Sequence, residues 1–385
     1  MMKLKYVFVL LLLLALPEMA SAYYVWRPCC FSCNRLAGWW ASADYMLMWR
    51  KERFYPALVT SNPVGDPVLG DPATRILFGD EKLSGCPKSG VRADGGLWWN
   101  RSFGFGGGFF LIGNEGHRFN FHGNNDSPPF LGRPFFNEVD GQQDAELFSA
   151  LFGMIITHGE IEIDTTNRMW GADAYACYRL YRSCHYKWDL LGGFYYNQLV
   201  DNLDISTRRR EFILLPDFHE TRHVHDKFNC TNNFYGGLLG VKTEMRGKSW
   251  ALAITGKAGI GYMQQRTKIS GSETIIDEAA DTVEIRPAGL LAQPSNIGRH
   301  HHNKFEVIPE FSVNLQYKVW CNAWFTAGYT CIYWPLVVLA GEQVDLRVNR
   351  SQFPGPTMGP LAPLFPNREK SFWTQGVTAG FYIFF

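Results

Sequence analysis

Histidine is the first residue type in this sequence whose spacing could support chemistry. His300, His301 and His302 are consecutive and could bind a transition metal. A metal site also needs ligands of fixed geometry and hydrogen bonds that orient them, and no carboxylate lies at an evident spacing from this run. We therefore interpret the three histidines as a polar loop tip, and we predict neither a metal nor another cofactor.

A second group could act as an acid–base set of the kind that an outer-membrane protease uses: His219, His223, His225 and Asp226. Nothing in the sequence fixes the mutual geometry of these side chains. We predict no catalytic residue and no enzymatic activity, and we keep a surface enzyme only as a second alternative function.

The nine cysteines could form disulfides or bind a metal. Cys29, Cys30 and Cys33 are spaced like a thiolate cluster, although disulfide formation suits an exported chain better. Cys177 and Cys184 flank an expected turn, but their parities differ, which argues against a bond between them. An odd number leaves at least one thiol free or paired with another chain.

Two further runs resemble functional motifs. Gly104-Phe105-Gly106-Gly107-Gly108 has the glycine content of a phosphate loop but no following helix and no Lys-Ser/Thr, so we expect a strand that alternates Phe and Gly. Arg208-Arg209-Arg210 is a basic run in an expected loop. A solvated loop face is the simplest interpretation, and binding to anionic lipopolysaccharide is the alternative.

The amino terminus predicts export. Lysines precede an unbroken apolar run at 7–16, and Ala20-Ser21-Ala22 offers a cleavage site. The run is shorter than the roughly 20 residues that a membrane helix needs. We predict a signal peptide at 1–22 and a periplasmic segment at 23–37. No later stretch approaches an apolar spanning helix, so residence in a membrane would require strands.

Composition favours strands and disfavours a nucleic-acid partner. The formal charge is +1, 15% of the residues are aromatic, and there are 38 glycines. Chains rich in aromatic residues and glycine but poor in charge favour strands and turns over helices. Near neutrality also removes the electrostatic attraction that binding to nucleic acid requires.

Period-two alternation of apolar and polar residues is the dominant pattern and predicts strands. It is clearest from Lys304 to Val319, a run of about 15 residues against the roughly 5–6 usual in globular strands. Pro309 removes one backbone donor from this run, so we expect a bulge or the loop-side end of the strand there.

The connections between these runs alternate in length. Short turns fall near 98–102, 182–186, 246–249 and 318–322, and long irregular stretches near 51–89, 123–153, 207–225, 271–303 and 335–371. Outer-membrane barrels combine short periplasmic turns with long external loops in this way. For 38–385 we predict an all-β fold, a transmembrane antiparallel up-and-down β-barrel of about ten strands. Twelve strands is the alternative, if 117–122 and 155–164 form separate strands rather than extensions above the membrane.

The last strand carries the expected assembly signal. Its apolar positions alternate up to a terminal aromatic residue: Val377, Ala379, Phe381, Ile383 and Phe385. Such an edge would invite aggregation in water, whereas pairing with the first strand closes a barrel. The pattern looks like the signal that the outer-membrane barrel-assembly machinery reads. We therefore expect that machinery and outer-membrane lipid as partners, and the cell outer membrane as the location.

Eight segments, in order along the chain, resemble one known family. They are Gly38-Trp39-Trp40-Ala41-Ser42-Ala43-Asp44-Tyr45, Leu58-Val59-Thr60-Ser61, Ile76-Leu77-Phe78-Gly79, Arg133-Pro134-Phe135-Phe136-Asn137, Asp144-Ala145-Glu146-Leu147, Asp189-Leu190-Leu191-Gly192-Gly193, Asn233-Phe234-Tyr235-Gly236-Gly237 and Pro294-Ser295-Asn296-Ile297-Gly298-Arg299. The chain resembles a planctomycete outer-membrane family, the type 7 beta-barrel porins, over nearly its whole mature length. The resemblance implies an outer-membrane barrel and no established substrate or catalytic residue. After Gly193 the family carries Tyr-Arg-Tyr where this chain has Phe194-Tyr195-Tyr196, so we expect a lumen arginine to be missing.

Parity places charged residues of both signs in the barrel interior. These are Asp44, Arg92, Asp94, Asp173, Arg179, Lys187, Asp189, Lys242, Glu244, Lys257 and Glu310. An interior of about eight strands is just filled by side chains, whereas water-filled porins have roughly 16–18 strands. We predict a mostly filled lumen and a structural, surface-display or narrow-pore role. The alternative is a porin for passive diffusion of small solutes, which would then be its partners.

Overall fold

The computed structural model describes residues 38–385, apart from 84, 124–128, 153–154, 214–217, 279 and 353–354. The expected signal peptide (1–22) and periplasmic segment (23–37), with Cys29, Cys30 and Cys33, lie outside the described residues. Residues from Ala37 to Phe385 form one compact unit. No helix in the described part of the chain has the length and apolar character that a membrane span requires.

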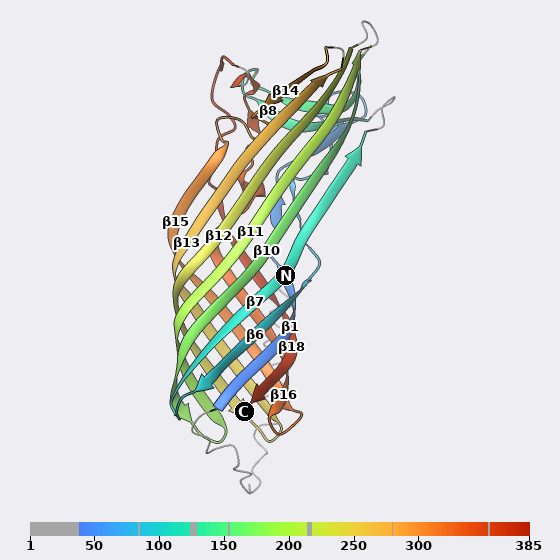
Figure 1. The fold of residues 1–385 in the computed structure, drawn as a ribbon. Coiled ribbons are helices and arrows are strands. Elements are labelled where there is room, and N and C mark those ends of the chain that lie inside the picture. Colours follow the sequence, from blue (N-terminus) through green and yellow to red (C-terminus); the bar gives the residue numbers. More distant parts are fainter. Residues whose placement is uncertain are drawn as a thin grey trace. The chain divides into compact units, whose positions relative to one another are not determined.

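Ten long antiparallel strands pair side by side in a ring (Figure 1). In order around it they are β1 (Gly38–Arg50), β6 (Lys88–Trp98), β7 (Phe103–His122), β10 (Ile155–Arg182), β11 (Tyr186–Ile213), β12 (Phe218–Arg246), β13 (Trp250–Asp277), β15 (Gly298–Lys318), β16 (Ala323–Val338) and β18 (Glu369–Phe384). β1 pairs with both β6 and β18, and β10 pairs with both β7 and β11, so each of the ten has two neighbours.

Eight shorter strands bring the number among the described residues to 18, more than the ten or twelve expected. They are β2 (Arg53–Tyr55), β3 (Val59–Asn62), β4 (Arg75–Phe78), β5 (Glu81–Leu83), β8 (Phe130–Asn137), β9 (Gln142–Phe152), β14 (Thr282–Arg286) and β17 (Arg347–Val348). All eight lie in stretches that the sequence led us to expect as irregular loops. These segments are partly buried, and buried backbone groups must be hydrogen-bonded, which strand pairing achieves.

The ring strands are also longer than expected. β10, β11 and β13 have 28 residues each and β12 has 29, whereas a tilted strand crosses a bilayer with about 9–11. β7 and β10 run without a break through 117–122 and 155–164, which are extensions rather than separate strands. Much of 207–225 and 271–303 is therefore strand, so these stretches were wrongly expected to be irregular.

The two faces of the long strands exchange their polarity part of the way along. On β11 the outward positions change from Leu190 and Phe194 to Asn202 and Asp204, while the inward positions become apolar, as at Leu203. Period two continues throughout, but its phase inverts. The half of each strand with an apolar outer face is typical of a ring in lipid. The half with a polar outer face and an apolar inner face is typical of a sheet that covers a core and faces water.

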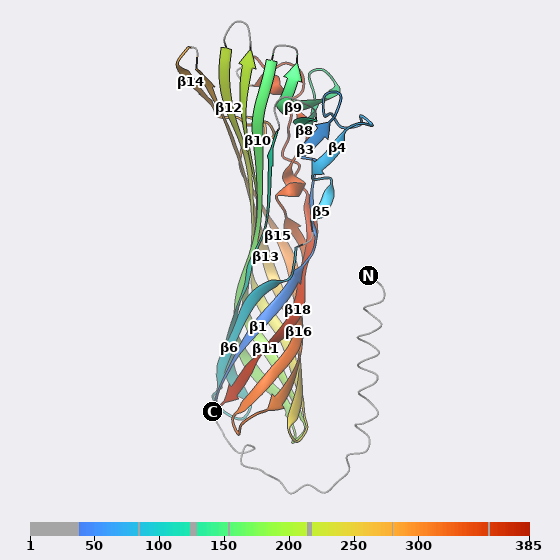
Figure 2. The same cartoon turned by 90° about the vertical axis from the view of Figure 1, so that its right-hand side faces the viewer.

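We call the upper part the tower (Figure 2). It comprises the described residues of 51–87, 113–122, 129–168, 198–232, 264–304 and 336–371. The short turns lie at the opposite end, at 99–102, 183–185, 247–249 and 319–322, where the sequence placed them. Phe385 lies at that end too, hydrogen-bonded to Trp39.

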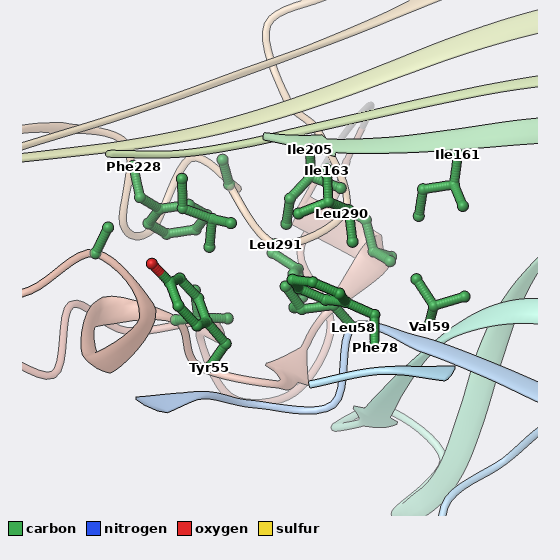
Figure 3. Close-up of a cluster of buried hydrophobic side chains, with 14 of the residues drawn as sticks. Tyr55, Leu58, Val59, Phe78, Ile161, Ile163, Ile205, Phe228, Leu290 and Leu291 are labelled. Carbon is green, nitrogen blue, oxygen red and sulfur yellow. The ribbon is translucent and has the colours of Figure 1, made fainter. Parts of the chain in front are cut away.

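A continuous apolar core holds the tower together (Figure 3). Tyr55, Leu58 and Phe78, from the segment after β1, face Ile163 and Phe228 on the inner side of the long strands. The long strands form one wall of the tower, and the loops that fold back form the other.

Pro309 lies within β15 without a bulge. β15 stays in register with β13 through Ala258↔Pro309, whereas its pairing with β16 extends only as far as Glu310. Proline has no backbone N–H to donate, and Pro309 lies just beyond the last residue of β15 that pairs with β16. The other expectation, that Pro309 marks the loop-side end of a strand, therefore holds for the pairing with β16 but not for the pairing with β13.

Candidate functional site

The outer surface of the lower ring is apolar on every strand. One exposed member on each is Tyr45, Val91, Phe109, Tyr178, Leu190, Leu239, Ile260, Phe311, Phe325 and Val377. We call this surface the belt. On β13 it extends from Trp250 to Tyr262, which corresponds to a height of about 30 Å at roughly 3.3 Å per residue and a tilt near 40°. An apolar surface of this extent marks contact with a membrane or another protein.

Aromatic residues form a row along the upper edge of the belt. Tyr196, Tyr235, Tyr262 and Phe305 are directly opposite one another on four successive strands. Ring centres lie 5.0 Å apart for Tyr196 and Tyr235 and 5.9 Å apart for Tyr262 and Phe305, and Trp170 adds a ring 4.9 Å from Tyr196. Such a row is typical of the aromatic girdle at a membrane–water interface.

The carboxyl-terminal strand completes the lower edge of the belt. Val377, Phe381 and Phe385 are exposed, and Ala379 and Ile383 share their parity. Phe381 is opposite Ala43 on β1, and the backbone N–H groups of Phe385 and Trp39 donate to each other's carbonyl oxygens at 2.9 and 3.2 Å. These contacts place the five expected assembly residues where the last strand meets the first.

All eleven charged residues that parity assigned to the interior lie on the inward face of the ring. Glu310 is at the centre of their contacts: it forms an ion pair with Arg92 of β6, and the hydroxyl of Tyr195 on β11 donates to it at 2.7 Å. Arg92 also lies 3.7 Å from Asp94. Tyr195 occupies the position where the family resemblance led us to expect the missing arginine, and there it hydrogen-bonds the central carboxylate.

A second set of interior contacts adds to this layer. Lys257 of β13 and Asp173 of β10 form an ion pair at 2.6 Å, and the Thr326 hydroxyl donates to Asp44 at 2.6 Å. Gly108 makes room for these groups, because a Cβ there would lie 2.3 Å from an Asp94 carboxylate oxygen. The Phe–Gly run of β7 therefore belongs to a strand, and Gly104, Gly106 and Gly108 face the lumen.

The remaining charged residues lie toward the short turns. Arg179 pairs with Asp189 at 2.8 Å and lies 3.7 Å from the ring centre of Trp98. Lys187 pairs with Glu244 at 3.7 Å. Lys242 approaches Trp40, so charged side chains occupy the lumen at more than one depth.

A cavity of about 80 Å³ remains among these groups. Its walls include Asp44, Arg92, Lys242, Lys257 and Glu310. Since a water molecule in the liquid occupies about 30 Å³, the cavity has room for a few waters and is far smaller than an open channel.

A further ionic cluster at the base of the tower closes the lumen from above, and we call it the upper seal. Arg53 is 1% exposed and pairs with Asp201 at 2.6 Å and with Glu115 at 3.4 Å. Asp201 also accepts from Asn167 at 3.1 Å and from the N–H of Ala340 at 2.8 Å. Burial opposes the charge on Arg53, but the neighbouring carboxylates raise its pKa above the ordinary value.

The sequence analysis did not identify the upper seal. Asp201 shares the inward parity of Asp189 on β11 and stands between the apolar residues Leu199 and Leu203. The sequence signal for this cluster was therefore one charged residue, Asp201, in a series of inward positions that is otherwise apolar at this point. Arg53 gives no such signal, because the chain leaves the ring before reaching it.

The three histidines and the aspartate of the second candidate group all belong to β12. His223 and His225 have outward parity on β12, whereas Asp226 is fully buried and accepts from Arg133 at 2.6 Å. His219 belongs to the start of the same strand. Asp226 also accepts from the backbone N–H groups of Leu291 and Ala292. It therefore anchors a loop, and it lies on the opposite face of the sheet from His223 and His225.

The polar runs lie in strands rather than at loop tips, which corrects two expectations. His300–His302 belong to β15, and His300 stacks on Phe365 with ring centres 3.9 Å apart. Arg208–Arg210 belong to β11, where Arg209 faces inward and its neighbours face outward. In both runs the strand continues into the tower, and successive side chains still point to opposite faces. The described residues contain no group of three or more potential metal ligands.

The two cysteines flanking the first long hairpin are both free thiols. Cys177 is buried in the lumen side of β10, whereas Cys184 is exposed in the turn. Their different parities separate them, as the sequence led us to expect.

Comparisons with known proteins identify a family and a set of distant structures. The family model described as “Putative beta barrel porin-7 (BBP7)” matches residues 40–385. The outer membrane protease OmpT from Escherichia coli is similar in structure at 8% identity and TM-score 0.40, covering 90% of this chain and 97% of that one. A Pseudomonas aeruginosa FadL homologue is similar at 7% identity and TM-score 0.22, covering 90% of each chain. No curated protein matches the chain.

Proposed function

We propose, from the premise that the chain belongs to the beta barrel porin-7 family, that it is an outer-membrane β-barrel with a closed lumen and a structural or surface-display role. The observation that carries the proposal is the pairing of Arg92 with Glu310 across the interior, continued above by the pairing of Arg53 with Asp201. Side chains from separated strands fill the space that a diffusion channel would need.

The belt and its aromatic row support residence in lipid. A lower ring with an apolar exterior on all ten strands is unfavourable in water and favourable in a bilayer. We propose the cell outer membrane as the location, reached by export and assembly through the barrel machinery, with the tower outside the cell. The resemblance adds a planctomycete source to this proposal.

A non-catalytic role is part of the same proposal. It is supported by the structural use of Asp226 and by the outward parity of His223 and His225. The tower offers a large polar outer face instead, which suits display or contact with other components of the cell surface.

A narrow pore or a porin for small solutes is the competing function. The family description favours it, and so does the polar cavity among the lumen charges. For solutes to pass, both layers would have to rearrange.

Conductance in planar lipid bilayers tests the closed lumen. We expect no large, steady conductance from the full chain. Replacing Arg92 and Glu310 together by Ala removes a cross-lumen pair without changing the net charge of the lumen, and we expect conductance to increase. The matched control is Arg118→Ala with Glu162→Ala, an exposed tower pair at 2.7 Å. Large, steady conductance from the unmodified protein would overturn the closed lumen and favour the porin.

Epitope tags test the sidedness of the barrel. A tag after Gly141, in the turn between β8 and β9, should be accessible to antibody on intact cells. A tag after Gly247, in the short turn between β12 and β13, should become accessible only after the membrane is opened. The opposite pattern would contradict an external tower.

A further inference from the structure

A small cavity in the tower lies apart from the lumen. Its volume is about 80 Å³, and its walls come from β9, β12, β13, β14 and the two loops that fold over them. Glu146, Glu273, Arg286 and Arg350 supply its charged walls. Two guanidinium groups and two carboxylates therefore line one partly open space.

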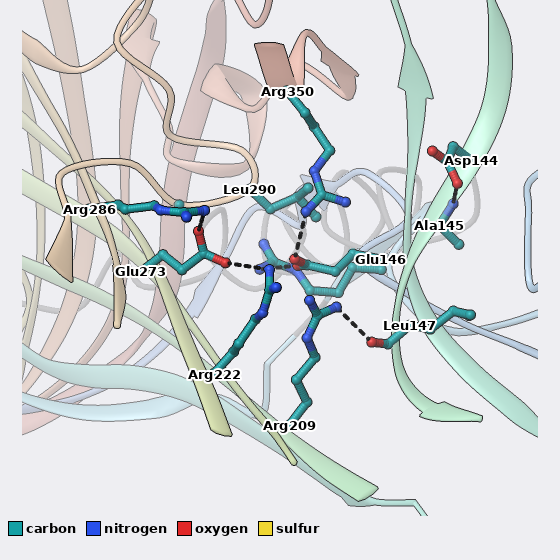
Figure 4. Close-up of polar contacts among 12 residues, drawn as sticks. Asp144, Ala145, Glu146, Leu147, Arg209, Arg222, Glu273, Arg286, Leu290 and Arg350 are labelled. Atoms are coloured by element: carbon teal, nitrogen blue, oxygen red, sulfur yellow. Dashed lines mark hydrogen bonds and ion pairs between the residues drawn. The ribbon is translucent and has the colours of Figure 1, made fainter. Parts of the chain in front are cut away.

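The two carboxylates of the cavity differ in how well they are paired with cations and hydrogen-bond donors (Figure 4). Glu273 lies between Arg222 and Arg286, at 3.5 and 3.4 Å. Glu146 is 3% exposed, and its Oε2 has no hydrogen-bond partner among the described residues. Nη1 of Arg133 lies 3.7 Å from Oε2, and Nη2 of Arg350 lies 3.9 Å from the other carboxylate oxygen, Oε1; both are beyond hydrogen-bonding distance. A buried carboxylate oxygen without a donor is costly, so this atom calls for a donor from a bound molecule.

Arg350 offers the complementary group. Its side chain is 44% exposed at the cavity wall, and within the described part of the chain its guanidinium makes the 3.9 Å contact with Glu146 but no hydrogen bond. A guanidinium with free N–H groups can bind a carboxylate through two parallel hydrogen bonds. The cavity thus presents an unmet acceptor and an unmet donor side by side.

We propose that this cavity binds a free α-amino acid with a small side chain, with the ammonium group on Glu146 and the carboxylate on Arg350. A lone anion would meet the two glutamates, and a lone cation would meet the arginines, whereas a zwitterion matches both walls. A cavity of about 80 Å³ suits glycine or alanine better than a sugar ring. Val224, Ala288 and Leu290 provide an apolar wall for a methyl group.

Calorimetric titration of the full chain in detergent tests the proposal. We expect glycine and L-alanine to bind with one-to-one stoichiometry. Acetate carries only the carboxylate and methylammonium carries only the ammonium group. Each should therefore bind at least tenfold more weakly than glycine. Inorganic phosphate should not compete. No detectable binding of either amino acid, or equal binding of acetate and glycine, would overturn the proposal.

Three variants locate the site. Glu146→Gln and Arg350→Gln should each weaken glycine binding at least tenfold. Arg347→Gln is the matched control, since Arg347 is in the same loop, 55% exposed, and pairs with Asp345 and Glu138 outside the cavity. If Glu146→Gln disturbs folding, as measured by thermal unfolding, Arg350→Gln decides the matter alone. Unchanged binding in Arg350→Gln would contradict the site even if glycine binds elsewhere. This outcome is independent of the conductance test of the lumen.

Discussion

The ammonium nitrogen of Lys242 lies 5.3 Å from the ring centre of Trp40, although their strands are diametrically opposed. β12 and β1 are separated by four ring strands on either side. A cation over an aromatic face is attracted by the electrons of the ring. This contact across the full width of the lumen, with the ion pair of Arg92 and Glu310, shows that side chains of distant strands meet inside a ten-stranded ring.

Neutralising the central carboxylate should destabilise the barrel. In Glu310→Gln, Arg92 loses the closer of its two ion-pair partners inside the ring, and Lys257 loses a nearby negative charge. Breaking a buried pair by changing one member typically costs about 3–5 kcal/mol. We expect a lower temperature of thermal unfolding in detergent. Glu162→Gln is the control, because Glu162 is 44% exposed in its pair with Arg118 and should change little. Equal effects would argue against a central role for Glu310.

The belt predicts a penalty for charge that depends on depth. Leu239→Arg places a cation in the middle of the belt on β12, where an arginine costs about 2–4 kcal/mol at the bilayer midplane. Asn229→Arg, with the same parity on the same strand but beyond the aromatic row, should be nearly neutral. The measurement is the free energy of unfolding from lipid vesicles. Equal penalties at both positions would contradict the assignment of the belt to lipid.

The upper seal should control access to the segment after β1. Asp201→Asn removes the partner of buried Arg53, at a cost of about 3–5 kcal/mol, and should loosen 51–83. The rate of trypsin cleavage after Arg75 and Lys82 should increase. Asp204→Asn, on the exposed face of the same strand, is the control. Unchanged cleavage in Asp201→Asn would show that the apolar core alone holds the segment.

Glu146 should make the stability of the tower depend on pH. Burial favours its neutral form, but Arg209, Arg350, Arg133 and Arg222 outweigh burial and lower its pKa below 4.5. A lowered folded-state pKa means that the charged form stabilises the fold at neutral pH, and this stabilisation is lost as pH falls below 4.5 through the folded-state value. Thermal unfolding between pH 7 and 3 should therefore show a smaller loss in Glu146→Gln, which has no proton to gain. An identical pH profile would contradict this role.

Deleting Phe385 should impair assembly more than stability. The residue is 56% exposed and its backbone joins Trp39, so its removal costs little packing within the chain. As part of an assembly signal it would be needed for recognition. We expect less protein in the outer-membrane fraction, while chain that does assemble unfolds at nearly the normal temperature. Wild-type levels in the membrane would count against the signal.

The amino-acid sequence was sufficient to predict the ring strands of the belt, the four short turns and the inward parity of charges such as Asp173 and Lys257. The reason is local: successive side chains in a strand point to opposite faces, so alternation is readable wherever one face is apolar and the other polar. The last strand, from Val377 to Phe381, could be read in the same way.

Which charges meet, and how far the strands continue, could be seen only in the folded chain. Pairs such as Arg92 with Glu310 or Arg53 with Asp201 join residues more than a hundred positions apart, and their partners depend on the curvature and stagger of the ring. The tower strands were hidden because their two faces exchange polarity at the level of Tyr196, where the outer surroundings change. Apolar and polar residues still alternate beyond that inversion. However, the contacts with the packed loops are needed to see that the inner face there forms the core of the tower.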